Sequence, residues 1–145
     1  MVRSEQLLPA DILARATLRG NEYAWPVGDI PRVIEGARLA DLVNIGGQLQ
    51  LRVPGGDTCE CYWVEVDTFK TVTETADWQE RVLLTADAAL KQYKHLCDRH
   101  NFIEEIRSSF GKILQEFEAS GGEINDALCF VWYVETEDDA MRRNS

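Results

Sequence analysis

The sequence has no apolar run of membrane-spanning length, which sets the first limit on what the protein does. A membrane-spanning helix needs about 18 or more apolar residues in a row, and the run at residues 127–134 covers only eight. Near Met1, the pair Leu7-Leu8 is followed by Pro9, so a segment of signal-peptide length is also missing. We therefore expect a cytoplasmic protein whose four cysteines are reduced thiols.

The sequence has fewer basic than acidic residues. The chain has 15 Lys and Arg against 25 Asp and Glu, a net charge of -10, and residues 98–145 alone hold 11 acidic and 5 basic residues. No basic stripe with interleaved aromatics is present, so nucleic acid and acidic lipid surfaces are disfavoured as partners. The charge keeps a protein soluble, and it also suits a basic protein partner.

Catalytic signatures are missing too. The sequence contains no nucleophile elbow, P-loop, zinc-protease helix or dinucleotide fingerprint. Cys59 and Cys61 share one side of a predicted strand, but their spacing is shorter than that of zinc-binding pairs. His95 and Cys97 would lie about 200° apart around a helix, and His100 has no motif beside it. The sequence therefore favours a non-catalytic role and predicts no catalytic, cofactor-binding or metal-ligating residue.

Two helices are predicted in the first third of the chain. Pro9 favours the start of one helix that ends near Gly20, and Asp29 is a good N-cap for another. The second helix is predicted to end at Gly46-Gly47. Residues 21–26 are expected to form a loop between them, because Pro26 disfavours helical angles at the preceding residue.

A change of pattern marks the next element. Residues 48–53 alternate between polar and apolar, and residues 54–57 read Pro-Gly-Gly-Asp, a turn signal. We predict a β-hairpin over residues 48–66. The alternation slips within residues 61–66, which indicates a bulge or burial on both faces.

The second half is predicted to be mainly helical. Residues 67–77 are polar and read as a loop, and residues 79–84 as a third strand followed by a helix. One long helix over residues 78–100 is the alternative. The helix at residues 102–119 carries a continuous apolar stripe behind the N-cap residue Asn101.

The run at residues 127–134 does not alternate, so it is predicted to be a central strand covered on both faces. Residues 136–145 are expected to be a frayed tail. The fold class is therefore α+β: a single domain over residues 1–145, with a largely antiparallel sheet of about four strands and segregated helices in the order α-α-β-β-β-α-α-β. If every helix covers one sheet face, one of two apolar sets would lie bare: Leu128, Phe130, Trp132 and Val134, or Cys129, Val131 and Tyr133.

Three surfaces are candidates for binding a protein: an aromatic loop, the polar face of the hairpin and the acidic helix. The loop could instead fold Trp25 over the core, and the hairpin face could be an ordinary solvated surface. The candidate residues are Glu22, Tyr23 and Trp25 of the loop, Gln48, Gln50, Arg52, Glu60 and Tyr62 of the hairpin, and Glu104, Glu105, Glu116 and Glu118 of the helix.

The leading hypothesis is an acidic protein-binding domain that neutralises a basic partner, as small acidic inhibitors do; this comparison rests on charge and size alone. One alternative is a small enzyme or ligand-binding domain with a pocket between hairpin and helices. Another is a structural subunit that forms homo-oligomers through its sheet. The pocket would be walled by Trp25, Arg52, Tyr62, Trp63 and His95.

Overall fold

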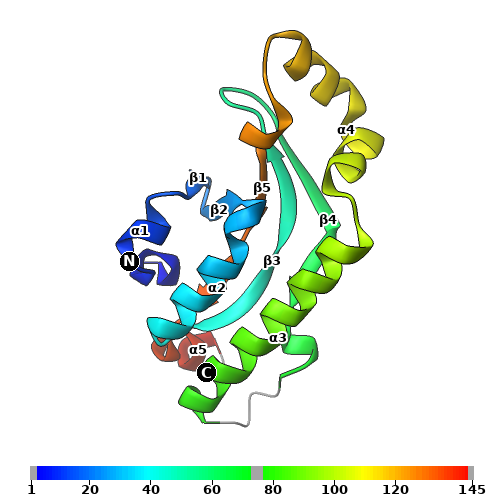
Figure 1. Cartoon of the computed structure of the whole chain (residues 1–145). Helices are drawn as coiled ribbons and strands as arrows, with labels where there is room; N and C mark the ends of the chain where they lie inside the picture. The colour runs from blue at the N-terminus through cyan, green and yellow to red at the C-terminus, as the bar shows by residue number, and fades with distance from the viewer. Residues whose placement is uncertain (1–2, 73–76, 144–145) are drawn as a thin grey trace.

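A long antiparallel hairpin, β3–β4, organises the fold (Figure 1). The computed structural model describes residues 3–72 and 77–143, and in it β3 spans Val43–Arg52 and β4 spans Thr58–Asp67. The hairpin predicted from the alternating pattern is confirmed, although β3 begins five residues earlier than the pattern indicated. Both strands are long and strongly curved in Figure 1.

Among the described residues, the sheet has six strands rather than about four. Strand β5, Leu128–Val131, lies between β2, Glu22–Pro26, and β3, and its burial at every position confirms the predicted central strand. The order across the sheet is β1-β2-β5-β3-β4, and β6, Tyr133–Glu135, pairs with β3 after a break at Trp132. All pairings are antiparallel, including that of β1, Thr17–Arg19, with β2.

Three predicted elements are wrong. The helix predicted from Pro9 to near Gly20 is limited to α1, Ala10–Leu13, because Thr17–Arg19 pair with β2 as strand β1. The expected loop at residues 21–26 contains β2, which pairs with both β1 and β5. The expected third strand at residues 79–84 belongs to one long helix, α3, Trp78–Arg99. The Asp77 side chain accepts a hydrogen bond from the Glu80 amide at 2.9 Å and so caps this helix. Of the expected loop at residues 67–77, positions 73–76 lie outside the described residues.

Three helices lie on one face of the sheet (Figure 1). Helix α2 spans Ile30–Leu39 and α4 spans Phe102–Ala119, where Asn101 caps the first turn as predicted. Helix α2 ends well before the predicted glycine pair, because Asp41 adopts a left-handed conformation (φ 63°) that turns the chain into β3. Within residues 3–72 and 77–143, no helix combines the length and apolarity needed to cross a membrane. The shorter helical segments are η1 Ser4–Leu7, α1 Ala10–Leu13, η2 Val27–Asp29, η3 Thr68–Lys70 and η4 Ile124–Asp126.

The predicted frayed tail is ordered as far as Arg143. Residues Glu137–Arg143 form helix α5, in which Ala140 is buried in a small apolar cluster with Val43, Trp78 and Val82. The Thr136 hydroxyl accepts a hydrogen bond from the Asp139 amide at 3.1 Å, so it caps the helix start. Residues 144–145 lie outside the described part.

The core lies between the sheet and the three long helices. Phe130 and Trp132 point to this side, and the Tyr93 ring of α3 meets Phe130 edge-on with ring centroids 5.0 Å apart. On the opposite face, Val131 is fully buried and Cys129 nearly so. In the part of the chain that the structure describes, the bare apolar patch expected for one-sided helix packing is therefore not found. This removes that reason to expect a second copy.

Two consecutive glycines sit inside β3 rather than at a helix end. A Cβ on Gly47 would lie 1.6 Å from the Val131 carbonyl oxygen, and one on Gly46 would lie 1.9 Å from the Val66 carbonyl oxygen. Gly46 also has φ 136°, a conformation that other residues rarely adopt. Because both residues are glycines, the β3 backbone can approach β4 at Gly46 and β5 at Gly47. Both positions are close to the points where the register of β3 with β4 and with β6 shifts.

Asn44 of β3 is a fully buried amide that joins four parts of the fold. Its Nδ2 donates to the Ile34 carbonyl of α2 at 3.2 Å, and its Oδ1 accepts from Trp132 Nε1 at 2.8 Å. Its backbone amide donates to Thr85 Oγ1 of α3 at 3.1 Å, and its carbonyl accepts from Thr68 Oγ1 at 2.6 Å. Each group is satisfied, which a buried polar residue requires.

We expect Asn44→Ala to lower the free energy of unfolding by about 2–4 kcal/mol, because it leaves the Trp132 indole N–H buried without an acceptor. Asn125→Ala, at an exposed position, is the matched control and should change stability by no more than about 0.5 kcal/mol. Urea unfolding followed by circular dichroism measures both. Equal midpoints for the two variants would show that the junction is not needed.

Candidate functional site

A bulge in β4 presents two adjacent aromatic side chains to solvent. Gln48 pairs with Glu65, but the next residue, Leu49, pairs with Cys61, so residues 62–64 have no partner on β3. Val64 turns into the core, whereas Tyr62 is 61% and Trp63 52% exposed. The slip in alternation predicted from the sequence is thus a bulge.

Carboxylates hold both aromatic residues in place. The Tyr62 hydroxyl donates to Glu60, and Trp63 Nε1 donates to Glu105 of α4 at 2.9 Å. His100 Nδ1 also lies 2.9 Å from Glu105. These residues line the sheet edge formed by β4, with Glu60 and Tyr62 on the polar side and Glu105 on the helix side. We call Glu60, Tyr62, Trp63 and Glu105 the Tyr62–Trp63 surface.

Hydrogen bonds shift the pKa values of two side chains on this surface, Glu105 and Tyr62. The hydrogen bonds from Trp63 and then His100 lower the pKa of Glu105, because they stabilise its charged form. The hydrogen bond to Glu60 raises the pKa of Tyr62. At neutral pH Glu105 is therefore ionised and Tyr62 is neutral.

The polar face of the hairpin is a connected network rather than a set of separate solvated side chains. Arg52 Nε donates to Gln50 Oε1 at 2.9 Å, and Gln50 Nε2 donates to Glu60 Oε1 at 3.1 Å. Since Tyr62 also donates to Glu60, four of the predicted residues lie in one chain of hydrogen bonds. Gln50 is fully buried, which an ordinary solvated sheet face would not show.

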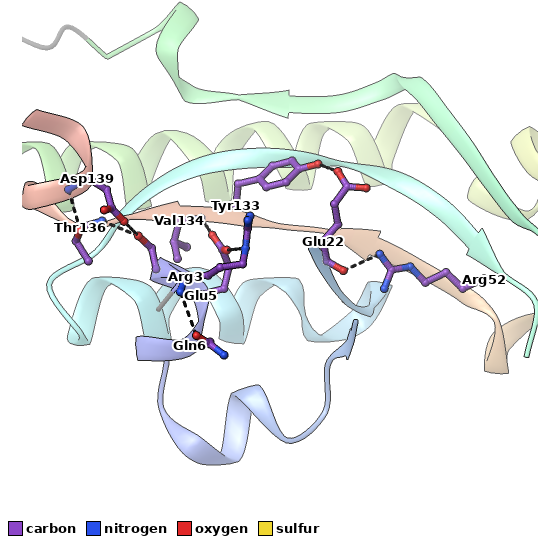
Figure 2. Close-up of polar contacts among 10 residues, drawn as sticks. Arg3, Glu5, Gln6, Glu22, Arg52, Tyr133, Val134, Thr136 and Asp139 are labelled. Atoms are coloured by element: carbon purple, nitrogen blue, oxygen red, sulfur yellow. Dashed lines mark hydrogen bonds and ion pairs between the residues drawn. The ribbon is translucent and has the colours of Figure 1, made fainter. Parts of the chain in front are cut away.

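Tyr133 extends this face toward β2. Its hydroxyl donates to the Glu22 carboxylate and accepts from Gln48 Nε2 at 3.3 Å, and Figure 2 shows Tyr133 and Glu22 reaching toward each other. Burial and the bond to Glu22 raise the pKa of Tyr133 to about 12. The structure thus joins Glu22 of the predicted loop to Gln48 of the hairpin.

The aromatic loop does not form the predicted binding loop. Trp25 is fully buried in β2, and its Nε1 donates to the Ile12 carbonyl at 2.8 Å. Tyr23 is half-buried, with its ring centroid 6.4 Å from that of Trp25. The alternative, a tryptophan packed into the core, is the structure observed.

The acidic helix α4 keeps part of its predicted surface. Glu104 and Glu116 are exposed, whereas Glu118 pairs with Arg107 at 3.1 Å. Glu105 belongs to the Tyr62–Trp63 surface because it accepts the hydrogen bond from Trp63. Figure 1 shows the first part of α4, which contains Glu104 and Glu105, beside β4.

The five pocket residues predicted between hairpin and helices do not share one pocket. Trp25 packs in the core and Arg52 lies on the opposite sheet face, while Tyr62, Trp63 and His95 are exposed. Apolar side chains fill the space between hairpin and helices. They include Leu49, Leu51, Cys59, Cys61, Val64, Phe102, Ile106 and Leu114.

A cavity of about 670 Å³ lies where η1, the β1–β2 turn and β6 meet (Figure 2). Its charged side chains are engaged with protein groups. Arg3 Nε lies 3.3 Å from Glu5, which also accepts from the Val134 amide at 3.0 Å. Ser4 bonds Asp139. These contacts join the N-terminal segment to β6 and to α5, which accounts for the lining side chains without a ligand.

The thiols and histidines form no metal centre in the described part of the chain, where no three potential ligands come together. All four cysteines are free, and Cys59, Cys61 and Cys129 are buried. Burial raises the pKa of Cys61 and of Cys129 to about 11, so both thiols stay protonated at neutral pH.

Comparison of the chain with protein-family models, with curated proteins and with solved structures finds no match.

Sequence reasoning missed two residues that complete the polar face. The alternation within the apolar run placed Tyr133 with Cys129 and Val131, opposite Phe130, but it gave no sign that the hydroxyl would bond Glu22 and Gln48. Arg19 belongs to a strand of three residues, which is too short to leave a periodic pattern.

We expect Glu105→Gln to destabilise the fold by about 1 kcal/mol at pH 7, because it weakens two charge-assisted hydrogen bonds. The pKa of Glu105 is lower in the folded state, so this stabilisation is present above the ordinary carboxyl pKa. It disappears as the pH falls through the folded-state value.

Urea unfolding of both proteins between pH 7 and pH 3 tests this expectation. Glu104→Gln is the control, since that neighbouring carboxylate touches neither Trp63 nor His100; its effect should stay below about 0.5 kcal/mol. A difference between wild type and Glu105→Gln that grows on acidification would contradict the assignment.

Proposed function

We propose that this chain is a non-catalytic protein-binding domain, and that the Tyr62–Trp63 surface and the adjoining acids of α4 take a basic partner. The observation that carries the proposal is the β4 bulge, which exposes two aromatic residues and positions a carboxylate against each. Bulges commonly re-aim side chains next to functional sites.

Composition supports a binding role for this surface. Trp and Tyr are enriched among the interface residues that contribute most of the binding energy. Here the hydrogen bonds to Glu60 and Glu105 already restrict both side chains. Less side-chain entropy is then lost on binding, which favours affinity.

Charge supports the choice of a basic partner. The net charge is -10, Glu60 and Glu105 belong to the surface, and Glu104 is the exposed neighbour of Glu105 in the sequence. Complementary charge raises the association rate more than it slows dissociation, and added salt screens it. The aromatic pair would then set the lifetime of the complex.

Affinity capture with matched baits tests the function. The wild-type chain should retain a basic protein in stoichiometric amount at low salt, and less of it at high salt. Trp63→Ala should weaken the purified complex about tenfold or more, as expected when a central aromatic contact is removed. Biolayer interferometry gives the two rate constants separately.

Leu39→Ala is the matched control, because Leu39 is an exposed apolar residue (69%) on helix α2, away from β4. It should retain the same partner with unchanged affinity. Recovery of no basic protein, or equal retention by Trp63→Ala and Leu39→Ala, would overturn the proposal.

A further inference from the structure

A second cavity, of about 270 Å³, lies at the end of the sheet where β1, β2, β3 and β5 come together. It is lined by three arginines, Arg15, Arg19 and Arg52, together with Thr17 and Cys129. A cluster of guanidinium groups stands out in a chain whose net charge is -10.

Arg52 is only 5% exposed, and none of its hydrogen-bond partners is a carboxylate. Its Nη1 donates to the carbonyl and hydroxyl oxygens of Thr17 at 2.8 and 3.0 Å, and its Nη2 donates to the Glu22 carbonyl at 3.0 Å. Figure 2 shows the side chain reaching to Glu22. Burial lowers the pKa of Arg52, because a charge removed from water is destabilised.

Arg19 is also held by carbonyl and hydroxyl oxygens, which here come from the β3–β4 turn and the start of β4. Its Nη1 donates to the carbonyls of Gly56 and Asp57 at 3.3 and 3.1 Å and to Thr58 Oγ1 at 2.8 Å. Among the residues that the structure describes, neither Arg19 nor Arg52 forms an ion pair. The two positive charges therefore lie near each other without a bound counter-charge.

The nearby carboxylates are already engaged elsewhere. Glu22 accepts from the Tyr133 hydroxyl, and Glu60 accepts from Tyr62 and Gln50. At the cavity rim Arg15 pairs with Asp29, and Asp126 is exposed, so water screens its charge.

Donor groups remain for a ligand. In the part of the chain that is described, Arg19 Nε donates to no acceptor, and Arg52 Nη2 uses one of its two hydrogens. Guanidinium groups bind carboxylate and phosphate oxygens with short, charge-assisted hydrogen bonds. The volume suits a ligand of a few heavy atoms rather than a large cofactor.

We propose that this cavity binds a small oxyanion, a carboxylate or a phosphate, between Arg19 and Arg52. The anion supplies a full negative charge that balances the two arginines, which neutral carbonyl oxygens cannot do. This site does not depend on the Tyr62–Trp63 surface, so either proposal can fail without the other.

Titration of the full chain at constant ionic strength tests the site, with acetate and citrate as carboxylate probes and inorganic phosphate and sulfate as the others. Chloride is the reference ion. The ¹⁵N-Nε resonances of Arg19 and Arg52 should shift in a saturable manner with one of the two probe classes, and the thermal midpoint should rise. Which class saturates first identifies the ligand chemistry.

Arg19→Gln should weaken binding of the probe about tenfold or more while the chain stays folded, because Arg19 is only half-buried. Arg107→Gln on α4 is the control. It should retain full binding, as well as any general stabilisation by phosphate or sulfate. Arg52→Lys keeps the charge but loses the planar fork, and should bind more weakly than wild type.

Three results would overturn the proposal: no saturable shift with any probe, shifts spread equally over exposed lysines such as Lys91 and Lys112, or identical binding by Arg19→Gln and Arg107→Gln. In each case the arginines serve only to clamp β1 to the hairpin turn and to β2.

Discussion

The structure depends on one buried amide at the start of the long hairpin. Asn44 is excluded from water, and its side chain is satisfied only when α2 and Trp132 are both in place, while its backbone bonds Thr85 and Thr68. A buried amide without these partners is costly, so one arrangement of sheet and helices is favoured over others. The junction thereby decides which face of β3 meets the helices.

Because only one face of β3 meets the helices, the two faces of the sheet differ in chemistry. The face toward the helices is apolar and aromatic, as at Phe130 and Tyr93. The other face carries a connected polar layer in which tyrosines bond the carboxylates and main-chain carbonyls bond the arginines. Arg52 is thus separated from Glu60 by Gln50 rather than paired with it, whereas Trp63 bonds Glu105 on the side of β4 that faces α4.

Elements with a strong local pattern could be predicted. The alternation at residues 48–53 and the stripe at residues 102–119 report directly on which side chains face the core, and residues 127–134 form the central strand and its continuation. Strands β1 and β2 were missed because strands of three to five residues gain stability only by pairing, here β1 with β2 and β2 with β5. The apolar Val82, Leu83 and Leu84 resemble a strand locally, yet they lie within α3, where only Val82 is buried.

By itself the sequence determined the class of the protein: an acidic α+β chain with a hairpin, a capped amphipathic helix and a fully apolar strand, since these follow from composition and short-range periodicity. Tertiary structure alone decided which polar residues meet. Glu105 reaches Trp63, Tyr133 reaches Glu22, and Arg52 reaches Thr17, across separations that no local pattern encodes. Such contacts arise from strand order and sheet curvature, which depend on long-range packing and not on any single segment.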